Sequence, residues 1–453
     1  MEVTRTLARY LVNADAREVP KDVKREGVRS IVNWLGCAVG AARHDAVESA
    51  LAALLPFAGP PQASVLGRAE KTDILTASLM NGITSHIFDF DDTHLPTIIH
   101  PSGPVAPALF ALAEYRPVSG AELLHAFILG VEAECRIGNA VYPDHYDQGW
   151  HITGTAGVFG AAAACGRLLG LTEEQMTWAL GIAGTQSAGL REMFGTHSKS
   201  FHPGRAAQNG LTAALLAAKN FTSSKQVLEA KRGFANVMSA KQDYARITEG
   251  LGRSFEVSLN TYKPFACGIV IHPAIDACIQ LKREYRLTGD EVERVELSVA
   301  PLVLELTGKR TPQAGLEGKF SIFHSTAAAL IYGAAGEKQY SDECVRNPKV
   351  VALRGRVEAE VDPKKRDDEV HATIRLNDGR VLQKYIEHAI GSRERPMTDE
   401  DLSEKFHGLA DDILGRDQAG RLLDETWSLE SLSDAAAICR LATSKAERAS
   451  RRA

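Results

Sequence analysis

The sequence lacks the cysteine pairs and the long apolar runs that mark several protein classes. Its seven cysteines are scattered without a C-x-x-C pair, so the spacings of zinc fingers, redox dithiols and iron–sulfur clusters are missing. No apolar run reaches the roughly 18 residues that suggest a membrane span, and residues 1–9 do not have the order of a signal peptide. We therefore expect a cytoplasmic protein with reduced thiols and no membrane partner.

An excess of either charge is also missing. The 453 residues carry Lys+Arg 52 and Asp+Glu 57, a net charge of −5, whereas nucleic-acid-binding domains are usually basic. We expect no nucleic-acid partner. The 44% hydrophobic and 24% charged contents are ordinary globular values and exclude disorder. No nucleophile elbow or P-loop pattern is present either.

What is present is a change of periodicity along the chain. Up to about residue 266, apolar residues recur every three or four positions, which predicts helices that include Val23–Val39, Ile74–Phe88, Gly120–Ala140, Thr155–Leu169 and Arg205–Ala218. Further on, alternation predicts strands at Glu293–Ala300, Arg354–Val361, Glu369–Leu376 and Val381–Ile386, the last two joined by a hairpin turn. A helix is predicted between them at Ser325–Gly333. Helical signals return with a helix start at Thr398–Asp401 and a last helix at Leu432–Ala442, and residues 445–453 are predicted to fray.

This pattern predicts a mainly α protein in two domains. A large all-helical domain is expected from both chain ends, residues 1–266 and 397–453. A smaller α+β domain, residues 267–396, is expected as an insertion.

The histidines gather in one part of the chain that is poor in cations. Residues 86–202 hold eight of the 14 histidines but only five of the 52 lysines and arginines. So little surface charge indicates a mostly interior segment, where histidines need partners or a function.

The first polar cluster in this segment contains Asp89, Asp91, Asp92 and His94, followed by His100. Three interpretations stay open: helix capping and loop structure, a metal site of the kind a hydrolase uses, and a metal-free acid/base site. A second cluster places His151 at a glycine-flanked helix entry, where it can orient an anion or serve only a structural role.

The third cluster, residues 191–204, gathers Arg191, Ser198, Lys199 and His202 in a predicted loop before the helix at Arg205. So many donors in a cation-poor region favour an anion site. A fourth, weaker cluster contains Lys263-Pro264 and His272-Pro273, where a lysine before proline is also typical of an extended linker. Together the clusters suit a small polyanion, with a histidine or lysine moving a proton α to a carboxylate.

At this point the motifs resemble those of the MmgE/PrpD family over nearly the whole chain. The matching segments are Asp89–Thr93 with His100-Pro101-Ser102, Gly149–Thr155, Lys199–Gly204, Tyr262-Lys263-Pro264, Lys319-Phe320-Ser321 and Pro396-Met397-Thr398. The resemblance implies the same two-domain fold, with the α+β domain as a lid, a homodimer, and chemistry without a metal or organic cofactor.

The resemblance also implies a set of pocket residues. Asp89, His100, His151, Lys199 and Lys263 are expected to be catalytic, and the expected substrate-binding residues are Thr93, with Arg191, Ser198 and His202 from the third cluster, His272 and His324. His324 stands where the family often has a tyrosine. This departure, and an extra residue between Thr93 and His100, change the expected walls of the pocket relative to the decarboxylases.

We therefore expect a cofactor-independent lyase on a small di- or tricarboxylate, of the 2-methylcitrate dehydratase type. The alternatives are an epimerase of the iminodisuccinate type, a cis-aconitate decarboxylase, a non-catalytic binding protein on the same fold, and a metal hydrolase that uses Asp89, Asp91, Asp92 and His94.

Overall fold

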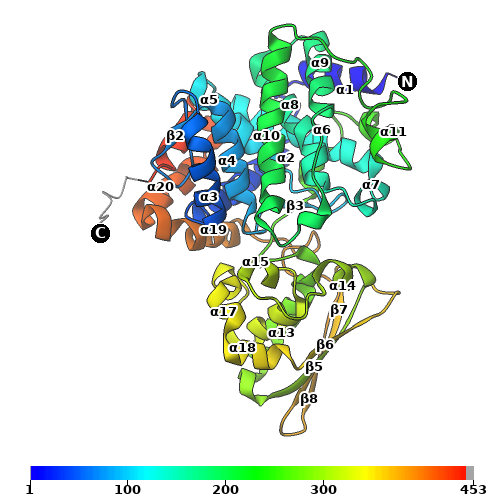
Figure 1. The fold of residues 1–453 in the computed structure, drawn as a ribbon, viewed down its shortest axis with the longest axis vertical. Coiled ribbons are helices and arrows are strands. Elements are labelled where there is room, and N and C mark those ends of the chain that lie inside the picture. The colour runs from blue at the N-terminus through cyan, green and yellow to red at the C-terminus, as the bar shows by residue number, and fades with distance from the viewer. Residues whose placement is uncertain (1, 445–453) are drawn as a thin grey trace. The chain divides into compact units, whose positions relative to one another are not determined.

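The computed structural model describes residues 2–444, which form two compact units (Figure 1). Unit 1 contains the described parts of Met1–Ile87, Asp91–Asn260 and Thr398–Ala453, and unit 2 contains Phe88–Phe90 and Thr261–Met397. The predicted mainly α fold is confirmed, since helices dominate both units. The sequence predicted domain borders at 266/267 and 396/397. Nothing in the sequence indicated that the three-residue segment 88–90 belongs to unit 2.

Unit 1 is built on helices whose ends follow from local sequence. The carboxylate of Asp73 accepts hydrogen bonds from two N–H groups in the first turn of α4, and Ser119 and Glu122 form a capping box at the start of α6. Gly170 ends α8 in the left-handed conformation. The elements are α1 Val3–Asn13, α2 Lys21–Gly40, α3 Asp45–Leu54, β1 Ala63–Ser64, β2 Lys71–Thr72, α4 Ile74–His86, β3 Thr93–His94, α5 Ser102–Tyr115, α6 Gly120–Val141, α7 Asp144–Asp147, α8 Ile152–Leu169, α9 Glu173–Gly184, α10 His197–Ala218, α11 Phe234–Met238, α12 Ala245–Thr248, β4 Asn260–Thr261 at the border, α19 Asp399–Leu414, α20 Arg416–Trp427 and α21 Ala436–Leu441.

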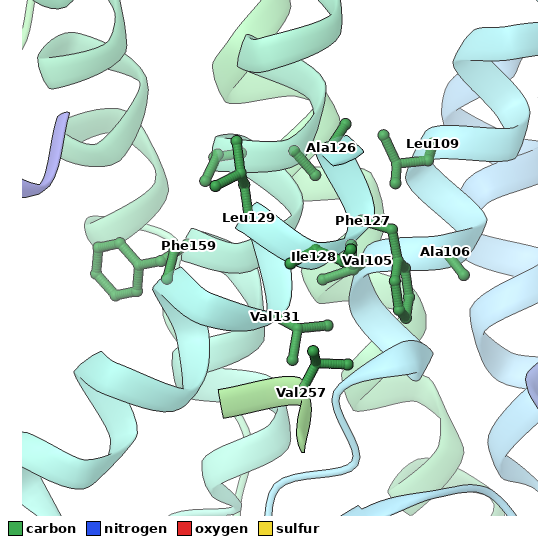
Figure 2. Packing of buried hydrophobic residues seen from close by; sticks show 14 of the residues in the cluster. Val105, Ala106, Leu109, Ala126, Phe127, Ile128, Leu129, Val131, Phe159 and Val257 are labelled. Carbon is green, nitrogen blue, oxygen red and sulfur yellow. The ribbon is translucent and has the colours of Figure 1, made fainter. Parts of the chain in front are cut away.

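The core of unit 1 lies where α5, α6 and α8 meet. Figure 2 shows apolar side chains of these helices packed together, with Phe127 from α6 beside Val105 from α5. Helix α10 packs against α8 and α4, and it crosses α4 at Gly82 and Gly204. A Cβ atom added to Gly82 would lie 2.4 Å from the Cα of Gly204, so this crossing requires glycine.

Two sequence predictions on these helices need correction. Helix α10 begins at His197 and contains Pro203, whereas the sequence predicted a loop up to Arg205. The buried face of its first two turns outweighs the helix-breaking tendency of Pro203. Helix α8 is 18 residues long with a mean hydropathy of 1.3, so one described helix does reach the length and composition of a membrane span. Since 83% of it is buried, it also has the properties of a core helix.

Both ends of the described chain contribute to unit 1. The predicted helix start at Thr398 is confirmed, because the Thr398 side chain caps α19. Helix α19 packs on α2, with the ring of Phe406 against Gly36. The last helix, α21, is shorter than predicted, and the carboxylate of Asp434 accepts a hydrogen bond from the N–H of its first residue, Ala436. The prediction that residues 445–453 fray lies outside the described residues.

Unit 2 contains a four-stranded sheet of order β6-β5-β7-β8, in which β5 and β6 are parallel and the other pairs are antiparallel. Alternate residues of β7 are buried, which confirms the predicted period of two, and α13 packs against β7 and β8. The predicted hairpin is confirmed, with Gly379 in the left-handed conformation. The elements are α13 His272–Tyr285, β5 Val292–Val299, α14 Pro301–Thr307, α15 Gly315–Gly318, α16 Ile322–Tyr332, α17 Asp342–Arg346, α18 Pro348–Arg354, β6 Val357–Val361, β7 Val370–Leu376 and β8 Val381–Ile386.

Candidate active site

Two histidines of unit 1 are held by neighbouring aspartates. His86 is the last residue of α4, and its Nδ1 lies 2.6 Å from Oδ2 of Asp91. His100 lies just before α5, and its Nδ1 lies 2.7 Å from the backbone oxygen of Asp92. All four side chains are buried, and the two imidazole centroids are 4.8 Å apart. Asp91 and Asp92, which belong to the first cluster of the sequence, therefore hold the imidazole rings of His86 and His100.

These contacts fix which ring nitrogen of His100 carries a hydrogen. A carbonyl oxygen only accepts, so Nδ1 of His100 donates to Asp92, and the lone pair of the neutral ring is on Nε2. The hydroxyl of Thr93 also lies 3.3 Å from Nδ1. For His86, donation from Nδ1 to the carboxylate of Asp91 places the lone pair on Nε2 in the same way.

A second histidine pair lies beside the first. His151 precedes α8, and its Nδ1 lies 2.8 Å from Nδ1 of His202 on α10. The ring of His151 is also 5.8 Å from that of His86. We call His86, His100, His151 and His202 the histidine cluster. Three separate motifs of the sequence thus meet at one place in unit 1.

Lys199 gives this cluster a positive charge. It lies in the first turn of α10 and is 7% exposed, with its ammonium 5.3 Å from the ring centroid of Phe194. Burial and then the charge of Lys199 hold the pKa of His151 well below its usual range. Burial, His86 and Lys199 lower the pKa of His202 to about 4. Both rings are therefore uncharged near neutral pH and can accept a proton.

Asp92 and Glu134 are two buried carboxyl groups of unit 1 that act on each other electrostatically. Asp92 accepts hydrogen bonds from the Ser102 hydroxyl at 2.6 Å and the Asn260 amide at 2.5 Å. Burial and then the charge of Asp91 raise the pKa of Asp92 to about 7. Glu134 on α6 is fully buried, neither of its oxygens accepts a hydrogen bond from the described residues, and burial raises its pKa well above the usual range.

The remaining predicted substrate-binding residues of unit 1 are differently placed. Arg191 is half-buried, and its guanidinium lies 4.1 Å over the ring of Tyr146 and donates to the Tyr146 carbonyl at 3.0 Å. Ser198 is exposed, although it directly precedes Lys199. Thr93 is buried and reaches His100. The hydrogen-bond contacts thus bring Thr93 and His202 to the cluster.

In unit 2, two buried lysines hold the segment 88–90. Lys263 donates to the backbone oxygen of Asp89 at 2.9 Å and to its carboxylate at 3.2 Å. Lys319 donates to the Phe88 carbonyl at 2.6 Å and to Glu337 at 2.5 Å. Asp89 has a φ of 51°, a conformation that costs a non-glycine residue energy and that Lys263 helps to maintain.

His272 and His324 also lie inside unit 2. His272 begins α13, with its ring 5.2 Å from that of Phe265. His324 on α16 is fully buried, and its Nε2 donates to the Gln339 carbonyl at 2.8 Å. Burial lowers the pKa of His324 to about 4. The predicted role of His324 in substrate binding stays a prediction.

The four residues of the predicted hydrolase site have separate partners. Asp89 pairs with Lys263, Asp91 with His86, and His94 with Glu256 at 2.9 Å. Among the described residues, three His, Cys, Asp or Glu ligand atoms come within 4.8 Å of one another in His86/His100/His151 and in Asp368/His388/Glu394. Neither group contains the predicted hydrolase set.

The site residues predicted from the sequence do not include His86, Asp91 or Asp92, although Asp91 and Asp92 belong to the first cluster, for which an acid/base site was one of three interpretations. His86 looked like the last residue of a helix, and the aspartates looked like one acidic run. A signal was present, because a histidine five residues before an aspartate at a helix end can fold back onto it. Nothing in the sequence distinguished Glu134 as a site residue, since it is spaced like any polar residue of α6.

The sequence matches known proteins along most of its length. Residues 5–247 match the MmgE/PrpD N-terminal domain, and residues 265–430 match the MmgE/PrpD C-terminal domain. The chain is 28% identical to cis-aconitate decarboxylase of Aspergillus terreus (strain NIH 2624 / FGSC A1156), covering 95% of this chain and 94% of that protein. It is 28% identical to human cis-aconitate decarboxylase over 81% of this chain and 78% of that protein, and 23% identical to 2-methylcitrate dehydratase of Cupriavidus necator over 81% of each.

Proposed function

Because this chain belongs to the MmgE/PrpD family, we propose that it is a cofactor-independent lyase acting on a small di- or tricarboxylate. The proposed chemical step moves a proton at the carbon α to a carboxylate. Dehydration of the 2-methylcitrate type is the reaction that the sequence predicts.

One observation carries this proposal: a buried cation, Lys199, lies near the uncharged imidazoles of His151 and His202. A substrate carboxylate would bind at the ammonium of Lys199, and His100 or His151 would take or deliver the proton. The bound anion would also raise the pKa of His151 and His202, because it offsets the charge of Lys199. Substrate binding would therefore make these imidazoles stronger bases.

The same arrangement favours the transition state. Removing a proton α to a carboxylate builds negative charge on that carboxylate, and a cation placed there beforehand stabilises the transition state more than the ground state. The roles of Arg191, Ser198, Asp89, Lys263, His272 and His324 remain the predictions made from the sequence.

Decarboxylation of a cis-aconitate-like substrate is the second candidate. It is favoured because the decarboxylase of Aspergillus terreus is more similar to this chain, over a longer stretch, than the dehydratase of Cupriavidus necator. The two reactions share a carboxylate-binding cation and a proton-transfer group, and they differ in the group that leaves.

A substrate panel followed by NMR in heavy water tests the proposal. Citrate, 2-methylcitrate, aconitate and iminodisuccinate analogues distinguish loss of water, loss of carbon dioxide, and deuterium exchange without elimination, which would indicate an epimerase. We expect His100→Ala to lower kcat/KM by about 100-fold or more and Lys199→Ala to lower kcat as well as raise KM. His371→Ala, an exposed position on β7, is the control and should keep wild-type turnover.

Three results would contradict the proposal. Turnover that survives in both His100→Ala and Lys199→Ala would show that neither residue has the role assigned to it. Ligands that raise the melting temperature without being consumed would indicate a binding protein. Loss of activity after exhaustive chelation would contradict a cofactor-independent reaction.

We also propose a homodimer, from the family resemblance, and a cytoplasmic location, from the scattered cysteines and the absence of a signal-peptide pattern at residues 1–9. The seven cysteines, all buried and not joined by disulfides, are compatible with a reducing compartment. The molar mass measured by light scattering, as the protein elutes from a size-exclusion column, would test the dimer. The mass of a monomer at micromolar concentration would contradict it.

A further inference from the structure

Three buried histidines of unit 1 converge closely enough to ligate one ion. One ring nitrogen each of His86, His100 and His151 lies within 4.8 Å of the others. Tetrahedral zinc bound to imidazoles at about 2.0–2.1 Å needs nitrogens about 3.3 Å apart, so the three rings would move closer together when they bind an ion. All three residues are at most 5% exposed.

The partners of these histidines match those around metal-bound imidazoles. A histidine that ligates a metal almost always donates its other ring N–H to a carboxylate or a backbone carbonyl. His86 donates from Nδ1 to Asp91 at 2.6 Å, and His100 donates from Nδ1 to the Asp92 carbonyl at 2.7 Å. In the neutral rings of His86 and His100, the lone pair that could bind a metal is therefore on Nε2.

His151 completes the set as a neutral ring. Its Nδ1 lies 2.8 Å from Nδ1 of His202, and in the tautomer in which His151 donates to His202 the lone pair of His151 is on Nε2. A metal binds an imidazole through a ring nitrogen that carries no hydrogen. The charge of Lys199 opposes a bound cation, whereas the carboxylate of Asp91 offsets that repulsion.

We propose that His86, His100 and His151 bind one divalent transition-metal ion, for which Zn²⁺ is the probe, and that the bound ion inhibits the enzyme. Inhibition follows because the ion occupies the lone pairs that proton transfer uses. The inhibitory part rests on the proposed function, whereas the binding part does not.

Calorimetric titration of chelator-treated full-length protein with Zn²⁺ tests the site. We expect one ion per chain, visible ligand-field bands when Co²⁺ replaces Zn²⁺, and loss of binding in His86→Phe. Asp91→Asn keeps all three ligands but removes the carboxylate behind His86, and should weaken binding about 10–100-fold.

The second histidine–carboxylate group of the chain supplies a matched control. Asp368, His388 and Glu394 in unit 2 also come within 4.8 Å of one another but are partly or fully exposed. His388→Gln should leave zinc affinity and stoichiometry unchanged. Wild-type protein that takes up no zinc, or binding that His388→Gln abolishes and His86→Phe retains, would overturn the site.

Turnover measured in the same samples separates this inference from the proposed function. We expect chelated protein to be active and added Zn²⁺ to lower its turnover in parallel with binding. Active protein that binds no zinc overturns the site and leaves the proposed function intact. Zinc binding without turnover of any carboxylate supports the site and overturns the proposed function. Turnover that zinc increases overturns the inhibitory role.

Discussion

The charge of Lys199 acts on the histidines around it, and Lys199→Met removes that charge while keeping a long side chain. We expect the pKa of His202 to rise above about 4 in this variant. It should stay below the usual value of a histidine, because burial, the largest cause of its lowering, is unchanged. Imidazole resonances followed by NMR through a pH titration measure the change.

The same titration contains an internal control. The pKa of His324 in unit 2 is lowered to about 4 by burial, and Lys199 is not among the groups that act on it. It should be the same in both proteins. An unchanged pKa for His202, or equal movement of both histidines, would contradict an electrostatic role for Lys199.

Glu134 is a buried carboxyl group whose effect on stability depends on pH. Burial raises its pKa well above the usual range in the folded protein, so there is a range of pH in which it keeps its proton in the folded state and loses it on unfolding. The stability that it contributes at low pH is lost as pH rises above about 4.5. The glutamine of Glu134→Gln cannot ionise, so the free energy of unfolding of the variant relative to wild type should increase with pH, by at most about 1.4 kcal/mol per pH unit.

Urea unfolding at pH 5, 6 and 7 measures this trend. Glu122→Gln on the same helix is the control, because Glu122 is exposed and Ser119 lowers its pKa. Glu122 is ionised in both states across this range, so its replacement should shift stability equally at each pH. A pH-independent effect of Glu134→Gln would show that Glu134 is ionised in the folded protein.

At the scale of elements, the crossing of α4 and α10 depends on two glycines. A Cβ atom at Gly204 would lie 2.4 Å from the backbone oxygen of Leu79 on α4. Since backbone atoms cannot rotate away, Gly204→Ala must separate the helices, and we expect it to destabilise the protein by about 1–3 kcal/mol. Because α10 carries Lys199 and His202, catalytic activity should fall as well.

Gly408→Ala provides the comparison for a helical glycine without close neighbours. Gly408 lies on the exposed side of α19, and a Cβ atom there meets nothing within 4 Å. Helix propensity then predicts a gain of up to about 1 kcal/mol. Equal effects of the two substitutions in chemical denaturation would contradict the close crossing.

At the scale of the whole molecule, unit 1 depends on contacts between distant parts of the chain. Phe406 on α19 is 1% exposed, and its ring packs against Gly36 on α2. Phe406→Ala leaves a cavity between these helices, and we expect a loss of about 3–5 kcal/mol in the free energy of unfolding. Phe57→Ala, at a residue that is 86% exposed, should change stability by less than about 0.5 kcal/mol.

Phe406 also provides a test of whether the two chain ends unfold as one cooperative unit. If unit 1 folds as one body from both chain ends, Phe406→Ala should lower the unfolding midpoint reported by Trp34 on α2 and by Trp427 on α20 together. Separate midpoints for the two ends would contradict a single cooperative unit.

Local sequence determined most of the helices and strands of this protein. Capping residues such as Thr398, the alternation in Glu369–Leu376 and the Asn-Asp-Gly turn act over a few residues, so they can be read directly from the sequence. The motifs that contain His100, His151 and Lys199 were also visible, because histidines concentrate in a segment that is poor in cations.

Only the tertiary structure decided how those motifs combine. The pairing of His151 with His202, of His86 with Asp91 and of Lys263 with Asp89 depends on which helices and loops pack together. The helical start of α10 and the burial of Glu134 depend on packing in the same way. Burial sets the protonation of these groups, because removing water from around a side chain disfavours its charged form. How much water is removed depends on packing, and the order of residues along the chain does not specify packing.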